Sequence, residues 1–335
     1  MTTIGDVARE AGVSRSTVSS VLTGRKFVTP KTRQRIEAAI EQLQFSVNAG
    51  ARALATARTM TIGVVVHLHQ GVFEPALAAY LFALSDAARE YGYSIMLLTD
   101  PDDVRAVRDA IAGRRVDGLI LLDVVDDDPR LALIEAKRFP ATLIGMPEQR
   151  HGIDAVDLDF AAAAAMLIDH LAEAGHTEVM FVTWPAALYQ TGSTYAVRFA
   201  ASARAQAAIR RVRLLERPVS VDPVAAHDDL IRLIADPGNP RALLVHNDTA
   251  AVVLPAVLHE LGLRLPDDRS VVSLHSAELA RFFTLDITSV ASEPFAASSL
   301  AVTLLMRRLA DPDAPAETRL IQPSLNLKGS APGVG

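Results

Sequence analysis

The sequence predicts a small all-α head containing a helix–turn–helix, followed by a large α/β body of two parallel-sheet subdomains. Three observations support this fold class. Apolar residues in the first fifty positions recur at helical spacing. From Met60 onward, short apolar runs alternate with amphipathic segments, which is the pattern of parallel sheets covered by helices. About ten such runs occur, which suits two sheets better than one.

The head opens with two short predicted helices joined by a tight turn. Thr3 and Asp6 have the spacing of a capping box, with Asp6 in a place more often held by Glu. Gly12 can take a positive φ in the turn at no steric cost, and Ser14 is a good N-cap for the second helix. The residues expected to face inward are Ile4, Val7, Ala8, Val18, Val21 and Leu22.

The opposite face of the second helix is small and polar, so it can enter the major groove of DNA. The residues of that face are Arg15, Ser16, Thr17 and Ser20. A third helix is predicted next, with Thr29 as its cap and Pro30 in its first turn. Its buried stripe consists of Ile36, Ala39, Ile40 and Leu43. On geometry alone, an ordinary helical bundle with a solvated face remains the alternative.

Charge is divided unevenly along the chain, whose formal total is −6. Residues 1–58 hold nine Lys or Arg against four Asp or Glu, which gives +5, and the remainder carries −11. A basic head on an acidic body favours phosphate contacts through the head alone.

Composition excludes several classes of protein. The chain has 335 residues, half of them apolar, which is enough for more than one domain. It contains no cysteine, so disulfides and cysteine-ligated metals are excluded. Residues 1–20 do not resemble a signal peptide, and no apolar run reaches the ~18 residues of a membrane span. We therefore expect a soluble cytoplasmic protein.

Residues 47–59 are expected to link head and body. Asn48 can cap a helix there, and the alanines that follow favour one. A helix of about eight residues is nevertheless too short to be stable alone in water. The segment is therefore expected to fray until something holds it.

The body alternates predicted strands and helices. The strands are predicted at 61–66, 94–98, 118–122, 141–144, 155–158, 179–182, 212–215, 242–245, 270–274 and 288–291. The helices are predicted at 74–91, 104–112, 160–175, 194–209, 223–235, 248–262 and 295–310. The two halves look like a weak duplication without a repeat at residue level. The acidic run Asp126, Asp127 and Asp128 is predicted to be a solvated loop.

Five stretches of the head carry a resemblance to a known family. They are Thr-Ile-Gly-Asp-Val-Ala (3–8), Ala-Gly-Val-Ser (11–14), Ser-Thr-Val-Ser (16–19), Thr-Pro-Lys-Thr-Arg (29–33) and Asn-Ala-Gly-Ala-Arg-Ala-Leu (48–54). In this order and spacing they closely resemble the headpiece of the lactose-repressor (LacI/GalR) family. The resemblance continues through the body at 116–120, 143–145, 156–159, 170–176, 247–248, 265–273 and 311–315.

This resemblance implies how the head would meet DNA. Arg15, Ser16 and Ser20 are expected to face base edges, although Ser20 stands where the family frequently has arginine. Phosphate contacts are expected from Ser14, Thr17, Thr23, Arg25, Thr29 and Thr32. In the hinge, the residues expected in the minor groove are Asn48, Arg52 and Leu54. Leu54 would wedge between base steps, and its alternative role is a linker leucine packed on the body.

The resemblance also implies the division of the chain into domains. We expect a DNA-binding headpiece at 1–46, a hinge helix or linker at 47–59, an effector-binding and dimerisation domain at 60–328, and a flexible tail at 329–335. The large domain is similar to periplasmic sugar-binding proteins. Its first subdomain is expected at 60–159 and 290–318, and its second at 160–289 and 319–328.

A ligand is expected in a cleft between the subdomains, because open parallel sheets bind ligands beyond the carboxyl ends of their strands. The residues that follow the predicted strands are His67, His69, Asp123, Met146, Trp184, His246, Asn247, Asp248, His275 and Ser292. The resemblance adds Arg198, at a place where the family has an arginine that grips a polar ligand, and it matches Asn247 and Asp248 to an Asn–Asp pair. It also shows departures, which put an ordinary neutral hexose in doubt. These departures are Ala76, Leu77, Met146, His275 and Ser292.

Three interpretations of the cleft histidines His67, His69, His246 and His275 stay open. They can be individually hydrogen-bonded, or they can form an effector site sensitive to anions or pH, because histidine titrates near neutral pH. The third interpretation is a transition-metal site, which no carboxylate or cysteine spacing supports. No metal and no cofactor is predicted.

These features together predict a DNA-binding transcriptional regulator, expected to be a repressor. A small-molecule effector in the cleft, such as a sugar or sugar derivative, would shift the body between two states and so change operator affinity. A homodimer on a palindromic operator is expected, because one headpiece reads one half-site. No leucine heptad follows the body, so a tail-made tetramer is not expected.

Other functions remain as alternatives. No catalytic motif occurs, so an enzyme is not expected. The alternatives are an activator, a regulator without a ligand, a nucleoid-type architectural protein, a solute-binding protein, and an enzyme on the same body fold.

Overall fold

The computed structural model describes residues 2–23, 27–45, 56, 58–66, 74–275, 280 and 285–331. The chain forms two compact units. One contains the head up to Thr61 together with Arg114–Asp117, and the other contains Ile62–Gly113 and the chain from Gly118 onward.

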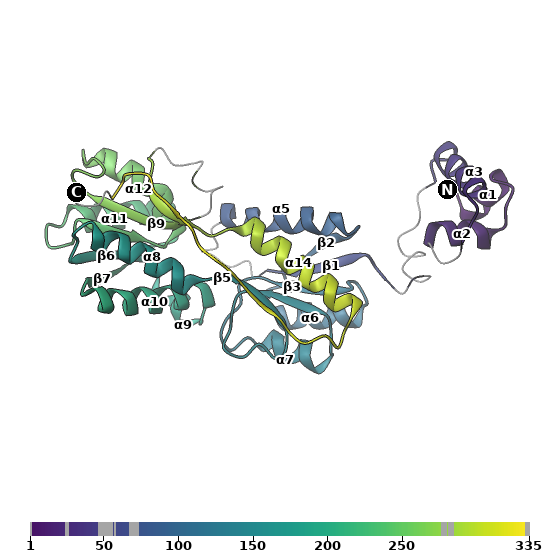
Figure 1. Cartoon of the computed structure of the whole chain (residues 1–335), viewed down its shortest axis with the longest axis horizontal. Helices are drawn as coiled ribbons and strands as arrows, with labels where there is room; N and C mark the ends of the chain where they lie inside the picture. The colour runs from purple at the N-terminus through teal and green to yellow at the C-terminus, as the bar shows by residue number, and fades with distance from the viewer. Residues whose placement is uncertain are drawn as a thin grey trace. The chain divides into compact units, whose positions relative to one another are not determined.

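The head is a unit of three helices, α1 at Ile4–Glu10, α2 at Arg15–Thr23 and α3 at Pro30–Gln42 (Figure 1). The capping box is confirmed, since the Asp6 carboxylate accepts the Thr3 N–H at 2.9 Å. Gly12 has a φ of +60°, which the turn requires. The inner faces share one core of Val7, Ala8, Ala11, Val18, Ile36 and Ala39.

The body contains two six-stranded sheets. The first has the order β11-β5-β4-β3-β1-β2. Its strands are β1 (Thr61–Val65), β2 (Ser94–Leu98), β3 (Gly118–Leu121), β4 (Ala141–Ile144), β5 (Asp154–Leu158) and β11 (Thr318–Ile321). The second has the order β12-β10-β9-β8-β6-β7. Its strands are β6 (Glu178–Thr183), β7 (Arg213–Pro218), β8 (Ala242–Val245), β9 (Ser270–His275), β10 (Thr288–Ala291) and β12 (Leu325–Asn326).

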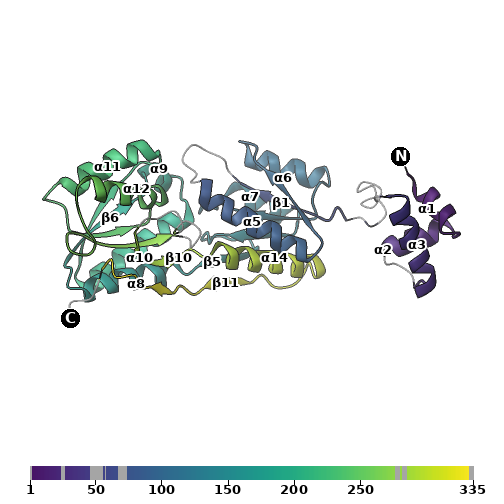
Figure 2. The same ribbon diagram turned by 90° about the horizontal axis from the view of Figure 1, so that it is seen from above.

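Helices flank both sheets. The helices of the first half are α5 (Glu74–Glu90), α6 (Asp103–Ala112), α7 (Pro129–Ala136) and α14 (Pro294–Ala310). Those of the second are α8 (Phe160–Glu173), α9 (Ala186–Gln190), α10 (Thr194–Arg210), α11 (Pro223–Ala235) and α12 (Asp248–Glu260). Figure 2 shows α14 beside α5, which it contacts. Within the described residues, no helix has the length and apolarity needed to cross a bilayer.

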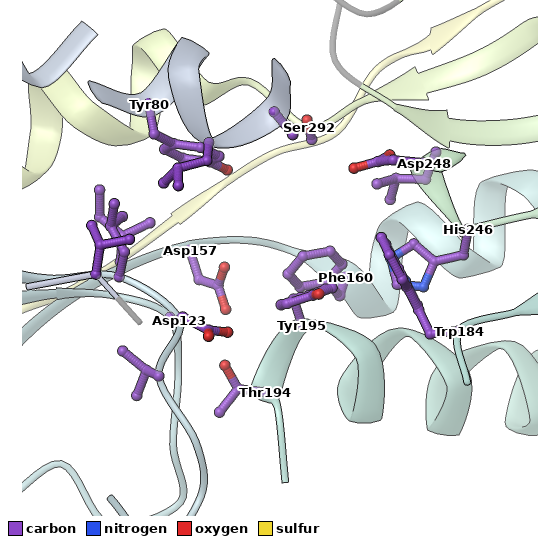
Figure 3. A pocket seen from close by; sticks show the side chains of 18 residues that line it. Tyr80, Asp123, Asp157, Phe160, Trp184, Thr194, Tyr195, His246, Asp248 and Ser292 are labelled. Carbon is purple, nitrogen blue, oxygen red and sulfur yellow. The ribbon is translucent and has the colours of Figure 1, made fainter. Parts of the chain in front are cut away.

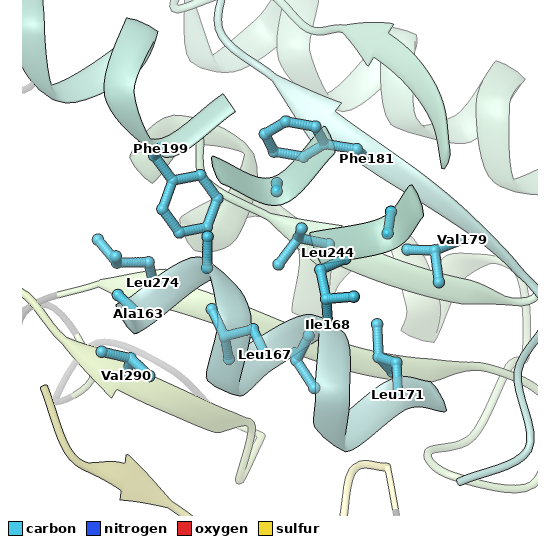
Figure 4. Packing of buried hydrophobic residues seen from close by; sticks show 14 of the residues in the cluster. Ala163, Leu167, Ile168, Leu171, Val179, Phe181, Phe199, Leu244, Leu274 and Val290 are labelled. Carbon is cyan, nitrogen blue, oxygen red and sulfur yellow. The ribbon is translucent and has the colours of Figure 1, made fainter. Parts of the chain in front are cut away.

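The second sheet shows how the apolar runs create layers. Val179 and Phe181 of β6 join a cluster with α8 and α10, whereas Met180 and Val182 join a cluster with α11 and α12. Successive side chains of a strand point to opposite faces, so a strand covered on both sides must be apolar throughout. Figure 4 shows the first cluster, in which the ring of Phe181 lies 5.8 Å from that of Phe199.

Most predicted elements are present, and three details differ from expectation. The segment from 319 was assigned to the second subdomain, but residues 318–321 form β11, which pairs in parallel with β5 of the first sheet. Only β12 joins the second sheet, antiparallel to β10. The helices α7 and α9 were not predicted, because they are too short to show a helical period.

The acidic run is the third difference, because Asp128 is only 5% exposed rather than solvated. It caps α7 by accepting the N–H of Arg130 at 3.0 Å. It also accepts the Arg130 guanidinium, with Nε 2.8 Å from Oδ1.

Candidate functional site

The outward face of α2 is the candidate DNA-reading surface. Arg15 and Ser16 are exposed and Ser20 is half-buried. Ser20 Oγ donates to the carbonyl of Ser16 at 2.8 Å, so the hydroxyl of this serine is bound to the backbone of its own helix. A Cβ on Gly5 would lie 2.8 Å from Arg15 Nη2, so the glycine leaves room for the guanidinium against α1. The face is polar and carries one cationic group, the Arg15 guanidinium.

Four of the six residues predicted to hold phosphates lie at two helix N-termini, namely Ser14 and Thr17 at α2 and Thr29 and Thr32 at α3. Ser14 Oγ accepts the N–H of Thr17 at 3.1 Å, and Thr29 Oγ1 accepts that of Thr32 at 3.4 Å. Backbone N–H groups of a helix start are unpaired donors that suit a phosphate. The predicted residues that lie outside the described residues are Arg25, Asn48, Arg52, Leu54, His67 and His69, together with the side chain of Thr23.

A pocket of about 190 Å³ lies in the body at the carboxyl ends of strands from both sheets. Five of the residues predicted at the strand ends line it, namely Asp123, Trp184, His246, Asp248 and Ser292. Figure 3 shows carboxylates of the first sheet on one side, and Trp184 and His246 on the other. The sequence rule that ligands sit beyond strand ends therefore locates this pocket.

The wall supplied by the second half is aromatic. Trp184 and Tyr195 make an edge-on contact with their rings 5.8 Å apart, and the His246 ring lies 6.1 Å from each of them. The other face of His246 packs on Phe199 at 4.1 Å. Trp184 Nε1 and His246 Nδ1 are buried, and neither has a hydrogen-bond partner among the described residues.

Burial lowers the pKa of His246 to about 3, so its ring is neutral at physiological pH. His275 lies outside the lining, where its Nδ1 is 2.6 Å from Ser273 Oγ, and burial lowers its pKa to about 4. These two histidines therefore give no charge for an anion. No group of three or more His, Asp or Glu in the described part of the chain could hold a metal ion.

Three acids, Asp123, Asp157 and Asp248, also line the pocket. Burial raises the pKa of Asp157 of β5 to about 7. The charge of Arg198, which donates a hydrogen bond to Asp157 Oδ2, opposes that rise. Burial also raises the pKa of Asp248 to about 7. Asp248 makes no hydrogen bond or ion pair with the described residues, and the surface it exposes borders the cavity.

A buried arginine fixes the loop that carries Asp123. Arg130 is 3% exposed and donates from Nη2 to the carbonyls of Asp123 at 3.2 Å and Leu122 at 3.4 Å. Asp123 itself has a φ of +51°, a conformation that aspartate tolerates better than most residues. The loop is thus shaped by contacts on its far side from the pocket.

Four predicted effector residues stand outside the pocket lining: Met146, Arg198, Asn247 and His275. Arg198 forms an ion pair with Asp157, and its Cζ lies 5.7 Å from the centroid of the Phe160 ring. The amide of Asn247 is used within the protein, since it caps α12 and donates to the carbonyl of Val219 at 2.9 Å.

Sequence reasoning missed several lining residues, including Asp157, Phe160, Thr194 and Tyr195. The sequence could have indicated Asp157, because it lies inside an apolar strand run and burying a carboxylate there costs free energy unless it has a partner. The other three lie in the first turns of α8 and α10 and do not follow a strand directly.

Comparisons with known proteins agree with this geometry. Residues 3–48 match the family model described as bacterial regulatory proteins, lacI family, and residues 168–331 match the periplasmic binding protein-like domain. The chain is 30% identical over 335 residues to the HTH-type transcriptional repressor PurR of Mannheimia succiniciproducens, covering 98% of each chain. It is 28% identical to the ribose operon repressor of Escherichia coli K12, covering 99% of this chain and 100% of that one.

Solved structures show the same fold. The lac repressor dimer bound to operator and the anti-inducer ONPF has a TM-score of 0.81 at 23% identity, covering 98% of this chain and 99% of that one. The complex of the transcriptional regulator CelR with cellobiose has a TM-score of 0.68 at 24% identity, covering 98% and 100%. With a helix–turn–helix head, a two-sheet body and a relative 30% identical along nearly the full length, this chain belongs to the lacI family of bacterial regulatory proteins and is a DNA-binding transcriptional regulator.

Proposed function

We propose that this regulator is a repressor that binds a palindromic operator as a homodimer and changes its operator affinity when a small molecule fills the body pocket. The observation that carries the proposal is the pocket itself, which is lined by residues from both sheets. A ligand that contacts two sheets can bind one arrangement of them more tightly than another, and only such a difference shifts an equilibrium. The protein would act by binding and not by catalysis, in the cytoplasm where DNA is found.

The functions of similar proteins support this proposal. These proteins include repressors, a repressor dimer on its operator, and a regulator complexed with a sugar. One three-helix head reads one half-site, so a two-fold dimer suits a palindrome. We assign base reading to Arg15, Ser16 and Ser20, with Arg15 directed to guanine. We assign the phosphate contacts and the minor-groove hinge as the sequence predicts.

Selection of bound sequences from random DNA would identify the operator, and gel shifts would then compare variants on it. Arg15→Ala should weaken specific binding by about 1–3 kcal/mol and relax the sequence preference at one base pair of each half-site. Arg89→Ala removes the same charge from an exposed body helix and should leave operator binding unchanged.

Leu54→Ala in the same series should weaken operator binding while leaving ligand binding to the body unchanged. Wild-type affinity in the Arg15 variant would contradict the base-reading assignment, and wild-type affinity in the Leu54 variant would contradict the wedge. An absence of any preferred palindrome would overturn the proposed function itself.

A further inference from the structure

We propose that the pocket selects an organic cation, namely an amine or ammonium compound with an apolar portion. This inference rests on the proposed function and specifies its effector class. It starts from the charge of the lining, in which Asp123, Asp157 and Asp248 contribute carboxylates and no described residue is Lys or Arg.

The nearby arginines act on two of the three lining acids, Asp157 and Asp123, but no described cation is paired with Asp248. Arg198 binds Asp157 and so balances that one carboxylate. Arg130 is paired with Asp128 and Asp103, and its charge also acts on Asp123. Asp248 has no cationic partner among the described residues. A carboxylate without a cationic partner in a partly enclosed pocket attracts a positive charge and repels a negative one.

The aromatic wall is the second, independent observation. The rings of Phe160, Trp184 and Tyr195 line the cavity that the carboxylates share, and Tyr80 joins them from α5 (Figure 3). Ammonium groups are attracted to the faces of such rings, most strongly to tryptophan. Asp123 and Asp248 both act electrostatically on the Tyr195 hydroxyl, which puts acids and rings around one common space.

The same lining is poorly suited to the other ligand classes. An anion would meet two or three carboxylates and a neutral His246. A neutral sugar needs several fixed donors and acceptors, and the amide of Asn247 and the guanidinium of Arg198 are already used within the protein.

The first experiment measures pocket charge directly through the sole tryptophan of the chain, Trp184, which borders the cavity. At constant ionic strength, caesium ions should quench its fluorescence several-fold better than iodide ions. Asp248→Asn and Asp123→Asn should each reduce that ratio. Asp127→Asn is the matched control, because it removes the same charge from an exposed position of the same loop outside the lining.

The second experiment compares two pairs of compounds that differ in the presence of a positive charge. These are choline against 3,3-dimethylbutan-1-ol, and glucosamine against glucose. Binding is followed by Trp184 fluorescence and by the melting temperature. In at least one pair the cation should bind about ten-fold more tightly or better, and Asp248→Asn should remove that preference.

The proposal requires both results, namely stronger quenching by caesium than by iodide and tighter binding of the cation in at least one pair of compounds. Equal quenching by caesium and iodide, or neutral compounds that bind as tightly as their cationic partners, would overturn it, and so would a lack of binding by both cations. Operator binding measured without any added compound tests the proposed function separately. If the protein binds its operator but shows no preference for cations, the proposed function stands and only the proposal of a cationic effector is rejected.

Discussion

The two sheets of the body share a topology but differ in what they contribute to the pocket. From edge to edge, β2-β1-β3-β4-β5-β11 corresponds to β7-β6-β8-β9-β10-β12, with the final strand parallel in the first sheet and antiparallel in the second. The first sheet contributes Asp123 and Asp157, whereas the second contributes Trp184 and His246. A repeated backbone therefore fixes where a ligand can bind, and the side chains at equivalent strand ends decide what binds.

The sheets also differ at their amino ends, and this difference gives the largest predicted effect. In the first, fully buried Asp154 accepts Arg307 and Arg308 at 2.9 Å each and the N–H of Glu317 at 2.7 Å. In the second, buried Ser330 donates to the Val271 carbonyl and accepts the Thr288 N–H at 2.8 Å.

Asp154→Ala leaves Arg308 without its carboxylate partner and Arg307 with Glu317 alone, and it should lower the free energy of unfolding by about 3–5 kcal/mol. Ser330→Ala removes neutral hydrogen bonds and should cost about 1–2 kcal/mol. Urea denaturation of both variants tests the comparison. Equal losses of unfolding free energy would show that the ion pairs of Asp154 stabilise the fold no more than the hydrogen bonds of Ser330.

A smaller effect is expected at the glycine that ends β4. Gly145 has a φ of +140°, and a Cβ there would lie 2.9 Å from Val124 Cβ and 3.2 Å from Thr194 Oγ1. Gly145→Ala should cost about 2–3 kcal/mol and weaken ligand binding, because the strained turn borders the pocket.

Gly152 is the control for this variant, since its φ is +70° but no atom lies within 4 Å of an added Cβ. Gly152→Ala should cost about 1 kcal/mol and leave ligand binding unchanged. Equal losses in thermal unfolding would mean that backbone conformation, and not the close approach to Val124, sets the cost.

The last effect depends on pH and on the acid supplied by α12. Burial raises the pKa of Asp248 from 3.8 to about 7. As pH rises from about 4, the unfolded chain releases this proton first, so the folded state loses stability until the pH passes about 7 and then loses no more.

Asp248→Asn lacks this loss. Relative to the wild type, its free energy of unfolding should therefore rise between pH 4 and pH 8, because the variant has no carboxyl that must lose its proton in the folded state. Binding of choline, whose quaternary ammonium does not titrate, to the wild type should strengthen over the same interval as the carboxyl becomes charged. A pH-independent difference between the two proteins would place the Asp248 carboxyl in contact with water.

Local chemistry made much of the architecture predictable. The capping box at Thr3, the turn at Gly12 and the cap at Ser14 depend on neighbouring residues, and all three are present. Asp123, Trp184, Asp248 and Ser292 line the pocket because each follows a strand directly or lies close to its end.

The remaining features depend on contacts that spacing along the chain does not reveal. Arg198 is on the predicted helix, yet its guanidinium binds Asp157, which is forty-one positions away. Asn247 follows its strand as expected, but its amide turns to the Val219 carbonyl. The side chain of a residue at a strand end can face the pocket or the protein, and only packing decides between the two.

The connections between the sheets have a consequence for dissecting the gene. The chain leaves the first sheet after β5, returns to that half after β10 to form α14 and β11, and ends in the second sheet as β12. A fragment that stops before residue 294 lacks the helix that packs on β3, β4 and β5. No uninterrupted stretch of codons therefore encodes either half, and isolating one would require a spliced or circularly permuted reading frame.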